Sequence, residues 1–123
     1  MARRSYSQAC GIARFLDALG ERWTLLVVRE ILFGEPSGEP KRFGEISARL
    51  PGVSRNLLAR RLKQLEAAGI VRRAGTEEHN AGWEATERGQ ELRPVLRTIG
   101  EWGLRNTDDP TEASRAGGGR RRS

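Results

Sequence analysis

Apolar residues recur at helical spacing along the first third of the chain. They predict an amphipathic helix over residues 10–19, which ends at Gly20, and a second helix over residues 23–33. The second helix is apolar on nearly every side, which is typical of a helix at the centre of a fold. The segment that follows, residues 34–40, is rich in Gly, Pro and Glu and predicts a surface loop.

Two shorter apolar-faced segments in the middle of the chain are separated by a tight turn. Residues 43–50 place apolar side chains at i, i+3 and i+7, and Pro51-Gly52 then interrupts the pattern. The Ser54 hydroxyl is suited to accept an N–H from the first turn of the next helix, which we expect at about residues 54 to 68. Two helices joined by such a turn form a helix-turn-helix.

A β-hairpin and a last helix are expected after this motif. Residues 70–73 and 83–86 indicate short strands around a polar turn at residues 75–82, which would place a wing directly after the second helix. Thr86 then caps a final helix with an apolar stripe at a/d-like spacing. The predicted fold class is mainly α with a small β-hairpin wing, a winged helix-turn-helix.

The domain organisation follows from the same pattern. We expect one winged helix-turn-helix domain at residues 9–105, with N- and C-terminal dimerisation helices. A flexible N-terminal arm would precede it at residues 1–8, and a disordered basic tail would follow at residues 106–123.

Positive charge is concentrated in the helix-turn-helix region. The chain has a formal net charge of +6, and residues 41–73 alone carry nine basic side chains against two acidic ones. A basic footprint confined to one region is what a phosphate backbone selects, so we expect a nucleic-acid partner. We expect no membrane association and a cytoplasmic location, because we find neither an apolar run of membrane-spanning length nor a secretory signal.

The chain offers little for catalysis or metal binding. It has one cysteine and one histidine, and no Ser/His/Asp order, metal-ligand cluster or phosphate-cradling glycine loop accompanies them. We therefore expect neither an enzyme nor a cofactor or metal site.

The second helix of a helix-turn-helix enters the major groove of duplex DNA, where residues near its N-terminus reach base edges. Three leucines of this helix form its inward stripe, which leaves as candidates for base reading the outward residues Ser54, Arg55, Asn56, Ala59, Arg60 and Lys63. Arginine forks fit guanine, asparagine pairs with adenine, and an alanine methyl packs on thymine. Any of these residues has a phosphate contact as its alternative.

Other basic residues flank the reading helix and are expected at phosphates: Lys41, Arg42, Arg49, Arg72 and Arg73. Arg61 lies beside the apolar stripe, so its stem is interpreted as structural. The predicted wing tip carries Glu77 and Glu78, which favours a weak wing contact at most.

The order of short motifs resembles the HxlR-type transcriptional regulators, a winged helix-turn-helix group akin to the MarR regulators. The resemblance covers roughly residues 9–103 and is carried by Cys10, Gly-Glu-Arg-Trp at 20–23, Arg-Phe-Gly-Glu-Ile at 42–46, Leu-Pro-Gly-Val-Ser at 50–54, Leu-Ala-Arg-Arg-Leu-Lys-Gln-Leu-Glu at 58–66, Gly-Ile-Val at 69–71, Thr-Glu-Arg-Gly at 86–89 and Trp-Gly at 102–103. The chain departs from that family in its longer loop at residues 34–41 and in Trp83, where Tyr is common.

The resemblance implies a homodimer that binds a pseudo-palindromic operator and regulates a nearby gene. A small-molecule effector would be compatible with this resemblance, but the sequence does not indicate which molecule it is. The dimer would be held by terminal helices, through Phe15, Leu92, Val95, Leu96, Ile99 and Trp102. The alternative for the last helix is packing on its own domain.

Two interpretations of Cys10 stay open. In some relatives a cysteine at this place senses oxidants or electrophiles, and Arg14, one helical turn on, would stabilise a thiolate. The other interpretation is a small, half-buried apolar residue at the dimer interface. For the protein as a whole, the alternative to operator binding is a winged-helix module for protein or RNA without operator specificity.

Overall fold

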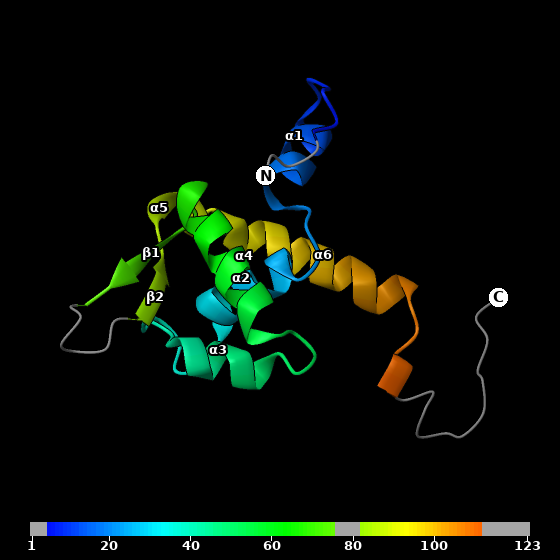
Figure 1. The fold of residues 1–123 in the computed structure, drawn as a ribbon. Coiled ribbons are helices and arrows are strands. Elements are labelled where there is room, and N and C mark those ends of the chain that lie inside the picture. The colour runs from blue at the N-terminus through cyan, green and yellow to red at the C-terminus, as the bar shows by residue number, and fades with distance from the viewer. Residues whose placement is uncertain (1–4, 76–81, 112–123) are drawn as a thin grey trace. The chain divides into compact units, whose positions relative to one another are not determined.

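The helices and strands follow the predicted order. The structure, a computed structural model, describes residues 5–75 and 82–111, and the chain divides into two units, Met1–Leu92 and Arg93–Ser123. The elements are α1 (Gly11–Leu19), α2 (Thr24–Phe33), α3 (Phe43–Arg49), α4 (Arg55–Ala67), β1 (Val71–Ala74), β2 (Gly82–Ala85), α5 (Glu87–Gln90) and α6 (Leu92–Asn106) (Figure 1).

Helix α2 lies at the centre of the first unit, as its all-round apolar pattern predicts. Val27, Val28 and Leu32 are at most 1% exposed, and the helix contacts α3, α4 and β2. From α3 and α4 the core receives Ile46 and the leucine stripe of α4, both buried. The helix-turn-helix is thus built around α2, because only that helix offers apolar side chains on several faces.

The turn between α3 and α4 requires a glycine. Gly52 has a φ of +107°, a conformation that L side chains rarely adopt. A Cβ at this position would also lie 3.4 Å from the Trp23 ring, which therefore sits against the turn. The Pro51-Gly52 signal thus marks both the end of α3 and the place where the α1–α2 link meets the motif.

Strands β1 and β2 form an antiparallel hairpin in which Arg73 faces Trp83. Lys41 extends this small sheet, since its backbone N–H donates to the Trp83 carbonyl (2.9 Å) and its carbonyl accepts from Trp83 (2.8 Å). The predicted wing tip, with Glu77, Glu78, His79 and Asn80, lies outside the described residues.

The C-terminal helical region differs from its prediction. Thr86 does cap a helix, since its hydroxyl oxygen accepts from Gly89 N–H at 3.1 Å. That helix is the short α5, and Glu91 separates it from α6. The Thr86 hydroxyl also donates to the carbonyl of Gly69, which fastens α5 to the link between α4 and β1.

Helix α6 carries exposed apolar side chains along its length. Val95, Ile99 and Trp102 are 39%, 46% and 58% exposed.

Among the described residues, every helix is too short or too polar to cross a membrane.

The ends of the chain depart in part from the predicted arm and tail. Ser5 and Tyr6, expected in a flexible arm, both donate hydrogen bonds to the Asp17 carboxylate at 2.9 Å. Helix α6 continues through Asn106, where the tail was expected to begin. The rest of the arm, residues 1–4, and of the tail, residues 112–123, lies outside the described residues.

Candidate nucleic-acid interface

The outward face of α4 is where the sequence predicts it. Leu58, Leu62 and Leu65 are at most 1% exposed and turn inward. The opposite face is exposed at the predicted residues, apart from the half-buried Ala59: Ser54, Arg55, Asn56, Ala59, Arg60 and Lys63. The Ser54 hydroxyl oxygen accepts from Leu57 N–H at 3.1 Å. Ser54 is therefore used to start the helix, and its hydroxyl hydrogen and second lone pair remain for DNA.

Two of the arginines are stacked on aromatic rings. The guanidinium carbon of Arg55 lies 4.8 Å from the ring centroid of Phe43, and that of Arg73 lies 4.8 Å from the ring centroid of Trp83. A guanidinium that lies over a ring with its flat face leaves its N–H edge available. Neither aromatic residue was among the predicted site residues.

Two other predicted phosphate contacts have carboxylate partners. Arg72 Nε is 2.8 Å from Glu84 Oε2 across the hairpin, and Arg49 Nη1 is 3.9 Å from Glu30 Oε1. Both arginines are at least half exposed. Exposed pairs of this kind contribute little to stability, so either arginine could exchange its carboxylate for a phosphate.

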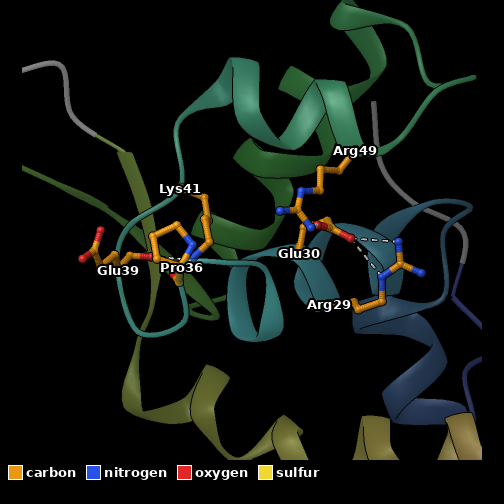
Figure 2. Close-up of polar contacts among 6 residues, drawn as sticks. All are labelled: Arg29, Glu30, Pro36, Glu39, Lys41 and Arg49. Carbon is orange, nitrogen blue, oxygen red and sulfur yellow. Dashed lines mark hydrogen bonds and ion pairs between the residues drawn. The ribbon is translucent and has the colours of Figure 1, made fainter.

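Lys41 is the clearest correction to the predicted site. It was expected at a phosphate, but it is 2% exposed. Its ammonium donates to the carbonyls of Pro36 (2.8 Å) and Glu39 (2.6 Å), as Figure 2 shows. The charge of Lys41 closes the loop before α3 and is not part of the exposed basic surface.

The Glu30 carboxylate pairs with two arginines, Arg29 and Arg49, that are far apart in the sequence. Figure 2 shows its carboxylate between Arg29 and Arg49. The Arg29 guanidinium donates to it through Nε (3.0 Å) and Nη2 (2.8 Å). Arg29 was missed because α2 is mostly apolar, and only the tertiary structure brings Arg49 of α3 to the same carboxylate.

Arg61 is structural, as expected from its place beside the leucine stripe. Its side chain is 9% exposed and lies 3.7 Å from the Glu21 carboxylate. It donates to the Arg22 carbonyl (2.8 Å) and to the Gln64 side chain (3.0 Å). The back of α4 is thereby tied to the link between α1 and α2.

A concave groove of about 610 Å³ lies between α3, α4 and the hairpin. It is lined by the basic residues Arg42, Lys63 and Arg73 and by the two aromatic rings described above. Glu45 and Glu66 also border it, so its charge is mixed. The Glu45 carboxylate accepts from Arg42 N–H at 2.8 Å and thereby caps α3.

The predicted dimerisation residues differ in their exposure. Leu92 is only 8% exposed, so its side chain is not available to a partner, and its assignment is corrected. Phe15 and Leu96 are half-buried. On α1, exposed apolar side chains are Ile12 (75%) and Leu16 (39%).

Cys10 is exposed and lies at the N-cap of α1, where its sulfur accepts from Ala13 N–H at 3.3 Å. The described residues contain no group of three His, Cys, Asp or Glu side chains that could hold a metal.

The fold, with a basic outward face on its second motif helix, defines a winged helix-turn-helix protein. The chain belongs to the HxlR-like helix-turn-helix family, whose model matches residues 18–111. It is a transcriptional regulator of this family, and a helix-turn-helix regulator binds DNA.

Individual relatives agree with this assignment. The uncharacterized HTH-type transcriptional regulator YvaP of Bacillus subtilis is 37% identical over 89 residues, which are 71% of this chain and 78% of YvaP. The reduced form of the transcriptional regulator YodB from B. subtilis is similar in structure (TM-score 0.63, 30% identity, 80% of this chain and 95% of YodB). The redox regulator HypR in its oxidized form is similar as well (TM-score 0.69, 29% identity, 81% of this chain and all of HypR). These relatives confirm that the chain is a regulator and not an enzyme.

Proposed function

We propose that the protein binds a pseudo-palindromic duplex operator as a homodimer, with α4 of each protomer in a major groove. The observation that carries this proposal is the outward face of α4, on which Arg55, Asn56 and Arg60 are exposed while the leucines behind them are buried. Arginine and asparagine on one exposed face near a helix N-terminus suit the reading of guanine and adenine edges.

The phosphate contacts of the proposal come from Arg42, Arg49, Arg72 and Arg73. All four are exposed, and they lie on α3, at its N-cap, or on β1. The homodimer is supported by the exposed apolar side chains of α1 and of α6, among them Ile12, Ile99 and Trp102. Exposed large apolar side chains of this kind mark protein interaction sites when they gather on one helix. The proposed location is the cytoplasm, where the operator is.

Binding to DNA should be specific for duplexes and strongly salt-dependent. Four phosphate-facing arginines per protomer make eight per dimer, so log Kobs should fall with log[salt] at a slope of about −7. Fluorescence anisotropy on a duplex selected from a random pool by the protein measures this slope. Unlabelled duplex of that sequence should compete, whereas its single strands and an RNA duplex should not. Equal competition by RNA would instead favour an RNA-binding winged-helix module.

A response to oxidants through Cys10 is the second part of the proposal. One support is that Cys10 is exposed and lies at the N-cap of α1. The other is that HypR is described as a redox regulator in its oxidized form and YodB as a regulator in its reduced form. In the proposed step the Cys10 thiols of two protomers lose two protons and two electrons to an oxidant and form one S–S bond.

Diamide, which accepts the two electrons and two protons, should give a covalent dimer on a non-reducing gel and alter operator affinity. Cys10→Ser is a matched control, because a serine hydroxyl can keep the N-cap while it cannot form the disulfide. If diamide changes the affinity of the Cys10→Ser variant equally, Cys10 is not the sensor.

A further inference from the structure

Two aromatic side chains line the groove between α3, α4 and the hairpin, and each lies beneath an arginine. Phe43 is the first residue of α3 and is half-buried, whereas Trp83 in β2 is 7% exposed. The distance from guanidinium carbon to ring centroid is 4.8 Å for Arg55 over Phe43 and for Arg73 over Trp83. Arg55 was predicted to read bases and Arg73 to contact phosphate. Arg73 and both rings line the groove.

We propose that Phe43 and Trp83 are positioning residues for DNA recognition, which hold Arg55 and Arg73 in place with their N–H edges free. The proposal rests on the proposed function, because it assigns a role to these rings only in DNA binding. A guanidinium stacked through its face keeps its in-plane donors for a guanine edge or a phosphate. An arginine ordered before binding also loses less conformational entropy when the complex forms.

The neighbouring arginines show what this arrangement avoids. Arg72, adjacent to Arg73 on β1, has its Nε 2.8 Å from the Glu84 carboxylate. Arg61 on α4 has its donors engaged by the Arg22 carbonyl and Gln64. Within residues 5–75 and 82–111, the guanidinium groups of Arg55 and Arg73 have no hydrogen-bond or ion-pair partner, and each lies over an aromatic ring. Stacking therefore restrains these two arginines without occupying the donors that DNA would use.

Both rings are held by the same scaffold. The Lys41 backbone pairs with Trp83 in both directions, at 2.9 and 2.8 Å, and Phe43 follows two residues later at the start of α3. The Lys41 ammonium is in turn fixed by the carbonyls of Pro36 and Glu39. The loop before α3 thus connects Trp83 and Phe43, and through them Arg73 and Arg55, by a short backbone segment that the Lys41 ammonium ties to Pro36 and Glu39.

A double-mutant cycle tests the role of Phe43. The probe is a duplex that the wild-type protein selects from a random pool, compared with a duplex of scrambled sequence. Phe43→Leu should lower affinity for the selected duplex about three- to tenfold. Phe43→Tyr, which keeps the ring, should bind like wild type. Arg55→Ala should lower that affinity about five- to 150-fold, and Phe43→Leu in the Arg55→Ala background should cause no further loss.

Additive losses in the cycle would overturn the positioning role while leaving DNA binding intact. A wild-type protein that enriches no duplex would overturn the proposed function and this inference together. A measurement on the wild-type protein avoids any folding defect of the leucine variant: the side-chain NMR resonances of Arg55 should be shifted upfield by the Phe43 ring current, relative to those of Arg60. Unshifted Arg55 resonances would also overturn the proposal.

Discussion

Replacement of Ile99 by glutamate should convert the proposed dimer into a monomer and lower operator affinity by about 100-fold or more. Ile99 is 46% exposed on α6, so a charge there is compatible with the folded protomer but costly in an apolar interface. Two linked reading helices gain about 10²- to 10⁴-fold over one through their effective concentration. Sedimentation velocity at micromolar protein, together with anisotropy on the selected duplex, measures both effects.

Leu104→Glu is the matched control for this experiment. Leu104 is 87% exposed on the same helix, and at five residues from Ile99 it lies about 140° around the helix, so the substitution adds the same charge outside the apolar stripe. It should leave a dimer of wild-type affinity. If Ile99→Glu still sediments as a dimer, α6 does not form the interface, and a wild-type monomer at this concentration would refute the homodimer itself.

Replacement of Arg60 by alanine should remove most of the preference for one base pair in each half-site of the operator. The affinity for the operator should therefore move towards the affinity for random DNA. A bidentate arginine–guanine contact contributes about 1–3 kcal/mol of discrimination, or roughly 5- to 150-fold. Arg60 is exposed on the outward face of α4. Competition anisotropy with single-base variants of the selected duplex would locate the base pair at which the preference is lost.

Two further variants separate reading from charge. Arg60→Lys keeps the positive charge but lacks the planar fork, so it should lose the preference and retain affinity for random DNA. Arg49→Ala should weaken binding to all duplexes alike, since Arg49 is assigned to a phosphate. An Arg60→Ala protein with unchanged preference would show that the reading face is placed wrongly.

The fold could be predicted from the sequence almost completely, because its signals are local. The leucine stripe of α4, the Ser54 cap and the Pro51-Gly52 turn each act over a few residues, and the structure has each where the pattern indicates it. The single last helix was wrong in detail, since Glu91 separates α5 from α6. The apolar periodicity of the sequence does not mark that break. Helix α5 is fixed by tertiary contacts of Thr86 and Gly89 with the link between α4 and β1, and such contacts leave no local pattern.

The candidate site could be predicted only as a set of exposed residues. Periodicity determines which α4 side chains face outward, because a helix with a buried leucine stripe leaves its opposite face to solvent. It does not determine which donors are free. Lys41 and Arg42 are adjacent basic residues in the sequence, yet one is buried against carbonyls and the other is exposed.

By itself, then, the sequence determined the winged helix-turn-helix, its basic middle region and the outward face of α4. The tertiary structure alone decided that Arg55 stacks on Phe43, that Arg29 and Arg49 share Glu30, and that Lys41 closes a loop. The physical reason is that an arginine or lysine side chain is long and flexible. Its partner is chosen among all groups that the fold brings within reach, and most of these lie far away along the chain.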